Sequence, residues 1–291
     1  MSNYNYKITK YKFILPSLII ILFLTYIPLI YTFILSLKKG RGNNLTFSGF
    51  ANYKELLSDE KFLISVRNST VFMLFLVPLI ILISIYLAYQ IYKLKSEKLQ
   101  NLFTTILYIP CITSPVAYSL FFKQIAYSDG ILSNYLRFIN ILGEDFNILQ
   151  NVWSARLLII AVCIWAWTGY YTLLLFTAMK NIDPSIYKAA KIDGANNFKI
   201  LRKIILPTIK PILNLITILV VIGTLQIYIE SSIITKGGPS YSTYTMVHYL
   251  YNRAFTYVAQ YGYSSAIGIV IFIICVIISI IMMKRMKNNE V

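Results

Sequence analysis

Six long apolar runs constrain the fold of this chain more than any other feature. A helix needs about 20 consecutive apolar residues to cross the roughly 30 Å hydrocarbon core of a membrane. The runs extend over Phe13 to Leu37, Thr70 to Tyr92, Leu102 to Phe122, Val152 to Met179, Thr208 to Thr235 and Tyr263 to Met283. Only 13% of the residues are charged, whereas soluble domains carry about 25%. We therefore predict an all-α polytopic membrane protein with six transmembrane helices.

The first run differs from a cleavable signal peptide because it is too long and contains several Tyr and Pro residues. We expect it to remain in the protein as a membrane anchor. The sequence is accordingly divided into a short N-terminal segment, residues 1–12, and a single transmembrane domain, residues 13–291.

Basic residues indicate how the spans are oriented, because Lys and Arg near span ends accumulate on the cytoplasmic side. With the N-terminus inside, the inner segments hold 16 of the 27 basic residues. Six acidic residues then lie outside and four inside. Both termini are predicted to be cytoplasmic, and the net charge of +16 is attributed to contact with acidic lipid, not with nucleic acid.

The residues do not predict catalysis or cofactor binding. His248 is the only histidine and has no neighbouring Cys or acidic cluster, so neither a metal site nor a nucleophile–base pair is expected. Cys111, Cys163 and Cys275 all fall in apolar runs, which argues against a disulfide framework. No phosphate-binding loop of the G-x-x-x-x-G-K-[ST] type occurs, so any ATP hydrolysis must take place on another subunit.

A basic stretch, residues 180–210, interrupts the apolar pattern between the fourth and fifth runs. Asp183 and Pro184 are typical of a helix start, and Gly194 is typical of a helix end. A helix of roughly nine residues is marginal in water. It therefore needs a surface that holds it.

Ile186, Ala189 and Ala190 follow helical spacing, which predicts one face with two small side chains that another surface can approach closely. We interpret this helix as a docking element, although an amphipathic connector remains the alternative. After Gly194, apolar and basic residues alternate at helical spacing. Pro207 and Pro211 are then expected to turn the chain back into the bilayer.

This stretch resembles the "EAA" loop of the membrane subunits of binding-protein-dependent ABC importers, and its Tyr-x-Ala-Ala-x-Ile-Asp-Gly-Ala form is similar to the carbohydrate branch. In that family the loop is the coupling helix, which is seated in a cleft of the ATPase subunit. The corresponding residues are Tyr187, Lys188, Ala189, Ala190, Asp193, Gly194 and Ala195. Lys188 stands where the family usually has Glu, so a contact with the ATPase is altered or dispensable.

The resemblance extends over nearly the whole chain and implies the type I ABC importer permease fold. It implies a multi-pass subunit of the bacterial cytoplasmic membrane that is not itself an enzyme. The implied partners are a second permease subunit, two ATP-binding subunits and an extracellular or periplasmic solute-binding protein that delivers a sugar. Rival hypotheses are a permease for glycerol phosphate, amino acids or peptides, and a proton-coupled secondary transporter.

Polar and aromatic residues within the fourth and fifth runs are candidates for the substrate pathway, because such residues tend to face a cavity or neighbouring helices. The candidates are Trp165, Trp167, Tyr170, Tyr171, Gly223, Thr224, Gln226 and Tyr228. The alternative is that the aromatics mark the membrane interface and the small residues allow helix packing. In maltose-importing relatives the sugar site lies on these two spans, which implies the location but not the individual contacts.

Glu230 is the one acidic residue within a predicted span. We expect it to reach the outer interface or to pair with a partner subunit. A proton-binding role, which would favour the secondary transporter, is the alternative.

Overall fold

A computed structural model describes residues 13–42, 44–141, 143, 146–256 and 258–287. The chain divides into two compact units, of which unit 1 comprises Met1–Leu63 and Leu250–Ile273, and unit 2 comprises Ile64–Tyr249 and Ile274–Val291. The predicted N-terminal segment, residues 1–12, lies outside the described residues. Among the described residues, the regular structure is helical apart from one short hairpin in unit 1.

Unit 1 begins with an apolar helix, Phe13–Ser36, which ends in a π-helical turn (Leu22–Tyr26) and α2 (Ile27–Ser36). An antiparallel hairpin follows, formed by β1 (Lys38–Arg41) and β2 (Asn44–Phe47), and then α3 (Ala51–Ser58). The unit is completed by a π-helical turn, Asn252–Thr256, and by the first part of α14 (Tyr261–Lys287).

Buried polar contacts hold unit 1 together. The amide nitrogen of Asn52 donates to the carbonyl oxygens of Ser36 and Lys38 at 2.8 and 2.7 Å. Gly262 lies so close to the hairpin that a Cβ atom there would be 1.8 Å from the Lys38 carbonyl oxygen. Asp59 accepts from the Tyr263 hydroxyl and forms an ion pair with Arg253.

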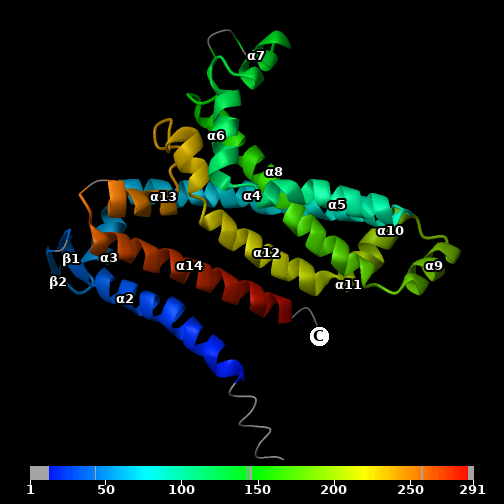
Figure 1. The fold of residues 1–291 in the computed structure, drawn as a ribbon, viewed down its shortest axis with the longest axis horizontal. Coiled ribbons are helices and arrows are strands. Elements are labelled where there is room, and N and C mark those ends of the chain that lie inside the picture. Colours follow the sequence, from blue (N-terminus) through cyan, green and yellow to red (C-terminus); the bar gives the residue numbers. More distant parts are fainter. Residues whose placement is uncertain (1–12, 43, 142, 144–145, 257, 288–291) are drawn as a thin grey trace, which may run out of the picture. The chain divides into compact units, whose positions relative to one another are not determined.

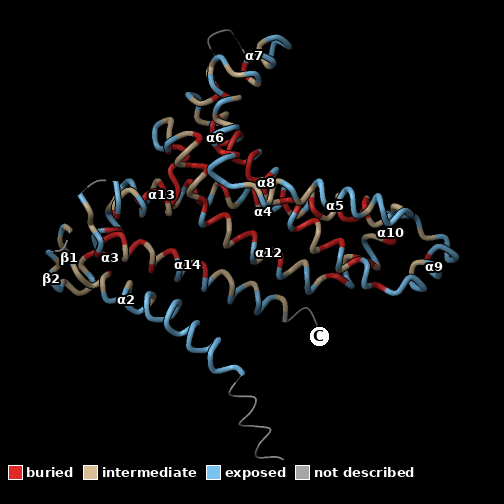
Figure 2. The backbone as a smooth tube through the Cα atoms, viewed as in Figure 1, coloured by how far each residue is buried: buried red, intermediate tan, exposed pale blue. Residues whose placement is uncertain are grey.

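The Phe13–Ser36 helix is the least buried apolar helix. None of its most apolar 18-residue window is buried within the described chain, and Figure 2 shows most of α2 exposed. Apolar side chains on such a helix require lipid or another protein as their surroundings.

Unit 2 contains most of the helices, and α4 and α14 run through both units. Its elements are α4 (Glu60–Tyr92), α5 (Glu97–Ile112), α6 (Pro115–Ala126), α7 (Ile131–Phe138), α8 (Val152–Lys180), α9 (Pro184–Ile192), α10 (Asn197–Ile200), a π-helical turn (Leu201–Ile205), α11 (Leu206–Thr208), α12 (Lys210–Leu225), a second π-helical turn (Ser231–Thr235) and α13 (Met246–Tyr251).

Within the described residues, four helices are long and apolar enough to cross a membrane, and two bent helix pairs bring the number to as many as six. The third predicted span, Leu102 to Phe122, is one of these pairs and not a straight helix. It bends by 90° between α5 and the Pro115–Phe138 part. Pro115 is the reason, because proline disfavours the helical conformation of the preceding residue, and Ser114 is accordingly not helical.

The fifth predicted span, Thr208 to Thr235, also differs from a continuous helix. The chain bends by 76° between Asn197–Thr208 and α12, and this bend lies between Pro207 and Pro211 as predicted. At its other end α12 stops at Leu225, ten residues before the predicted boundary. Beyond this end the Ile227 carbonyl accepts from the Thr245 hydroxyl at 2.5 Å, so the unwound backbone is bonded by a side chain.

The second predicted span, Thr70 to Tyr92, begins ten residues earlier than the apolar run, at Glu60. The Asp59 carboxylate explains this start, because it accepts from the backbone N–H groups of Lys61 and Phe62. A helix of 33 residues is about 50 Å long, which exceeds the membrane core, so α4 extends beyond it.

The packing of α5 against α8 depends on a glycine (Figure 1). A Cβ atom added at Gly169 would lie 1.7 Å from the Leu107 carbonyl oxygen and 3.3 Å from the Cys111 sulfur. The two backbones can therefore approach this closely only where α8 has no side chain.

We expect Gly169→Ala to destabilise the protein by about 1–3 kcal/mol, because the added methyl group must push α5 and α8 apart. Gly223→Ala is the matched control, since its Cβ would have the Trp167 ring as its nearest neighbour, at 3.9 Å. The midpoint of thermal unfolding in detergent measures both effects. Equal midpoints for the two variants would contradict the close-packing argument.

Candidate functional site

A cavity of about 290 Å³ lies in unit 2 among three membrane helices. Helix α5 contributes Tyr108 and Cys111, α12 contributes Gly223, and α8 contributes the rest of the lining. The α8 residues are Ala166, Trp167, Tyr170 and Tyr171. The α5–α8 contact at Gly169 brings the first two helices together beside this cavity.

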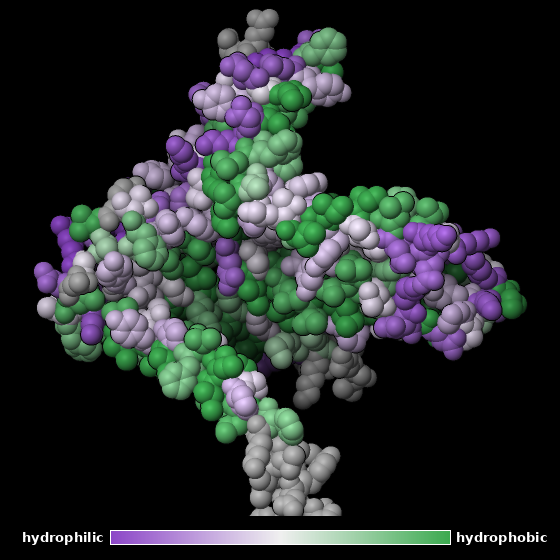
Figure 3. Space-filling model, viewed as in Figure 1, coloured by the Kyte–Doolittle hydropathy of each residue, from purple (hydrophilic) through white to green (hydrophobic). Residues whose placement is uncertain are grey.

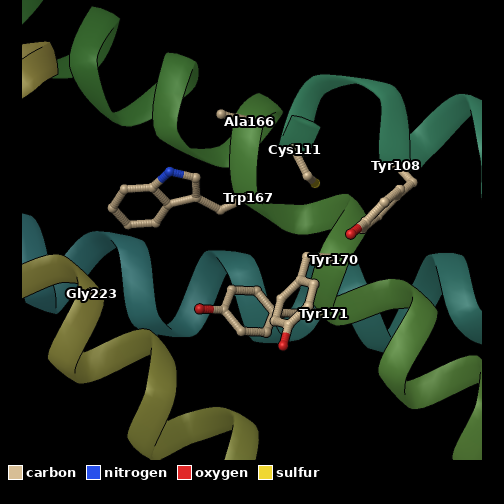
Figure 4. A pocket seen from close by; sticks show the side chains of 7 residues that line it. All are labelled: Tyr108, Cys111, Ala166, Trp167, Tyr170, Tyr171 and Gly223. Carbon is tan, nitrogen blue, oxygen red and sulfur yellow. The ribbon is translucent and has the colours of Figure 1, made fainter. Parts of the chain in front are cut away.

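Aromatic rings dominate the cavity, as Figure 4 shows. The rings of Tyr170 and Tyr171 pack edge to face with their centroids 5.3 Å apart. None of the lining residues carries a charged side chain. The cavity therefore offers ring faces and hydroxyl groups, but no counter-charge for an ionic ligand.

The structure brings together only part of the predicted pathway. Trp167, Tyr170, Tyr171 and Gly223 line the cavity, whereas Trp165 packs edge to face on Tyr118 and Phe122. The other predicted residues lie elsewhere. Thr224 is buried, with its hydroxyl bonded to the Val221 carbonyl; Gln226 is exposed; and Tyr228 packs on the His248 ring.

Sequence reasoning missed Tyr108, Cys111 and Ala166. The first two lie on the third span, which we did not consider for the pathway. The signal available for them was that Tyr108 and Cys111 stand on either side of Pro110, three residues apart and shortly before the break. Ala166 carries no chemical signal, since only its position between two tryptophans places it at the cavity.

Glu230 does not reach the outer surface of the described chain. Its side chain is 4% exposed and accepts a hydrogen bond of 2.5 Å from the Tyr118 hydroxyl. Tyr118 in turn packs edge to face on Trp165. Glu230 therefore links the chain after α12 to α6.

The predicted docking helix is present as α9. Asp183 caps its start by accepting from the Ser185 N–H at 2.8 Å, and this hydrogen bond lowers the pKa of the Asp183 carboxyl. At its end Gly194 adopts a left-handed conformation, with φ of 74°. The Ala195 N–H then bonds the Ala190 carbonyl, and the Gly194 N–H bonds the Lys191 carbonyl, which is the Schellman pattern.

The exposed face of α9 differs from the predicted one. Ala190 is buried against the core of unit 2, and Tyr187 and Ala195 are half-buried, so these three do not form a free surface. Ala189 is exposed, as are the predicted Lys188, Asp193 and Gly194. Sequence analysis placed Ile186 on the docking face but did not assign Ile192, which is 87% exposed. The available apolar surface is therefore formed by Ile186, Ala189 and Ile192.

A loop between α12 and α13 is held by buried polar side chains of two spans. The Asn68 amide donates to the carbonyls of Tyr241 and Tyr244. The Arg156 guanidinium donates to the Ser242 carbonyl at 3.0 Å and to the Asn68 side-chain oxygen at 2.9 Å. Burying an arginine within a span is unfavourable unless its guanidinium is hydrogen-bonded. The loop supplies one of these hydrogen bonds through Ser242, so the network helps to fix the position of the loop.

His248 lies in α13, directly after this loop, and outside the candidate spans. The Ser231 hydroxyl donates to the Thr243 carbonyl at 2.6 Å and lies 2.8 Å from His248 Nδ1. Because that hydroxyl has only one hydrogen, Nδ1 is the donor in the second bond. Burial lowers the pKa of His248 to about 4, so the ring is neutral at physiological pH.

Comparisons with known proteins show that the chain is similar to membrane components of transport systems. Residues 80–287 match the family described as binding-protein-dependent transport system inner membrane component. The chain is 34% identical to the lactose transport system permease protein LacF of Rhizobium radiobacter, over 98% of this chain and 96% of that protein. It is 30% identical to the arabinooligosaccharides transport system permease protein AraP of Halalkalibacterium halodurans, over 94% and 86% of the two chains.

Two solved structures share the fold. A chain of a bacterial ABC transporter involved in the import of the acidic polysaccharide alginate has a TM-score of 0.82 and 22% identity, covering 98% of this chain and 96% of that one. A chain of the alginate transporter in complex with alginate pentasaccharide-bound periplasmic protein has a TM-score of 0.80 and 24% identity, covering 96% and 93%. At sequence identities this low, the structural similarity establishes a shared fold and nothing more.

We expect the loop network to weaken as the pH falls from 7.5 to 5. The folded-state pKa of His248 lies below its ordinary value, so its stabilisation is complete above pH 6.5 and is lost as the pH falls towards 4. At pH 5 the loss is on the order of 2 kcal/mol. Thermal unfolding of the wild type and of His248→Gln across this range measures it. Parallel curves for the two proteins would rule out this role.

Proposed function

The chain belongs to the family of binding-protein-dependent transport system inner membrane components, and we propose that it is the permease subunit of an ATP-driven importer for an uncharged sugar or oligosaccharide. The observation that carries this proposal is the full-length similarity to a lactose permease, together with the aromatic, uncharged cavity in the membrane helices.

The cavity lining favours a sugar over the other cargoes considered. Aromatic faces cover the apolar faces of a sugar ring, and hydroxyl groups such as those of Tyr108 and Tyr170 bond its hydroxyls. Glycerol phosphate or an amino acid would bring charges into a low-dielectric site. Burying them without a partner of opposite charge is unfavourable.

The proposed assembly contains a second permease subunit, two ATP-binding subunits and an external solute-binding protein in the bacterial cytoplasmic membrane. The exposed Phe13–Ser36 helix offers surface for the lipid bilayer or for the companion permease. The solved neighbour in complex with a periplasmic protein supports the expectation of an external delivery protein. Both termini would then be cytoplasmic.

Helix α9 would transmit the ATP-driven movement of the ATPase subunit to the membrane helices. Its exposed face, formed by Ile186, Ala189 and Ile192, would sit in a cleft of the ATPase subunit, while the buried Ala190 anchors the helix to unit 2. Closure of the ATPase dimer would then move α9, and rigid-body rotation of the spans would expose the cavity to the outside. Coupling requires that the ATPase bind the two states with different free energies.

A proton-coupled transporter working alone is less well supported. Glu230 accepts a hydrogen bond from Tyr118 and does not line the cavity, so protonation there has no direct route to the cargo. An exposed apolar face on a nine-residue helix is also unexplained without a partner.

Uptake by vesicles containing the assembled complex tests the cargo. Labelled lactose and arabinose oligosaccharides should enter in an ATP-dependent manner that survives an uncoupler, and glycerol phosphate should not compete. Gly223→Phe should reduce uptake about tenfold or more, because the ring fills the cavity. Leu219→Phe, one turn away and outside the lining, is the control. Uptake that requires a proton gradient and no ATPase would contradict the proposal.

A bulky substitution at Ala189 tests the docking face. Ala189→Trp should prevent co-purification of the ATPase subunit and abolish ATP-dependent uptake, while the fold is retained because this residue is exposed. Lys199→Trp, an exposed position on α10, is the control and should retain both properties. If the ATPase still binds to Ala189→Trp, α9 is not the docking helix.

A further inference from the structure

A second and larger cavity lies in unit 2 between α9 and the end of α4. Its volume is about 500 Å³. One wall is the end of α4 with the residues that follow it, and the other wall is α9 with the start of α10. Figure 3 shows hydrophilic side chains gathered over the part of the unit where α9 and α10 lie.

Four lysines line this cavity and no carboxylate does. Lys93 and Lys95 come from the α4 wall, and Lys188 and Lys191 come from α9. All four are exposed, and within the described part of the chain none of them forms an ion pair with an acid, although Lys188 is close enough to Asp183 to lower the pKa of its carboxyl. Four ammonium groups around one space repel one another, and an anion between them removes that repulsion.

Tyr187 also lines the cavity. Its hydroxyl oxygen is buried and forms no hydrogen bond of normal length with a described residue. Burial and the neighbouring Tyr92 hydroxyl both raise the pKa of Tyr187, so the hydroxyl is neutral. Tyr187 therefore adds no negative charge to the space between the lysines.

The aromatic residues of the two cavity walls are held in place. The Tyr187 ring packs on Tyr92 with the centroids 5.1 Å apart, and the Tyr89 hydroxyl donates to the Asn197 carbonyl at 2.9 Å. The Lys93 ammonium lies 5.2 Å from the centre of the Tyr89 ring. These contacts fix the walls from both sides, so the donors surround a defined space.

We propose that this cavity binds a phosphate group, with Lys93, Lys95, Lys188 and Lys191 as its donors. A multiply charged oxyanion suits a site that offers several cationic donors and no carboxylate acceptor. The volume also leaves room for the organic group to which the phosphate is attached.

The phosphate has two possible sources. Lys93 and Lys95 directly follow α4, a candidate span, and the ends of spans are where the phosphates of anionic lipids lie. A soluble phosphate from the surrounding solution presents the same oxygens. In either case the bound group would bridge α4 and α9 and hold α9 in position.

An acidic side chain of the ATPase is a less suitable ligand. The exposed apolar face of α9 consists of Ile186, Ala189 and Ile192, whereas Tyr187, which faces the cavity, is half-buried. The proposal therefore concerns the side of α9 away from the docking surface. It does not depend on the nature of the cargo.

Hydrogen exchange of the purified full-length chain tests the site without any transport assay. One arm uses detergent without phospholipid, in which inorganic phosphate is titrated against chloride at constant ionic strength. The other arm compares nanodiscs of phosphatidylglycerol with nanodiscs of zwitterionic phosphatidylcholine. We expect saturable protection of residues 184–192 and 89–95. Protection by free phosphate identifies a soluble source, and protection by phosphatidylglycerol alone identifies the lipid.

Variants distinguish a specific site from general charge attraction. Lys93→Gln with Lys191→Gln should weaken the protection about tenfold, whereas Tyr187→Phe, which keeps all four lysines, should have little effect. Lys199→Gln with Lys203→Gln removes the same charge from exposed positions outside the lining and should have no effect.

The proposal is overturned if neither phosphate nor phosphatidylglycerol protects the wild type, or if the two lysine pairs behave alike. Protection that arises only when the ATPase is added would assign the cavity to an acidic side chain of that partner, and would also overturn it. The comparison of lipids on the wild type holds even if a variant fails to fold.

Discussion

The requirement that backbone N–H and C=O groups be bonded inside a membrane protein shapes this structure more than any single contact. The chain nevertheless leaves the helical conformation inside two of its apolar segments. At the first break the Thr113 hydroxyl bonds the Ile109 carbonyl, and after α12 the Thr245 hydroxyl bonds the Ile227 carbonyl. Polar side chains thus permit interruptions that the bilayer would otherwise exclude.

Both cavities lie close to places where a helix ends. The aromatic cavity is next to the break after α5, where the backbones of α5 and α8 meet at Gly169. The basic cavity lies where α4 and α8 end and the chain crosses to α9.

Much of the basic loop could be predicted from residue types alone, because its signals are local. Asp183 caps α9, Gly194 ends it, and the bend falls between Pro207 and Pro211. The pathway residues were predicted less well. Trp165 and Trp167 are two residues apart on one helix, yet only Trp167 lines the cavity, since the neighbours of a helix determine which face encloses a space.

By itself, the sequence determined the helical membrane class, the number of apolar segments and the ends of α9, since hydropathy, capping and proline act over a few residues. Tertiary structure alone decided that Ala190 is buried while Ala189 is free, that Glu230 accepts from Tyr118, and that four lysines from two distant segments surround one cavity. These outcomes depend on contacts between residues far apart in the chain, and periodicity along a single helix carries no information about the partner it meets.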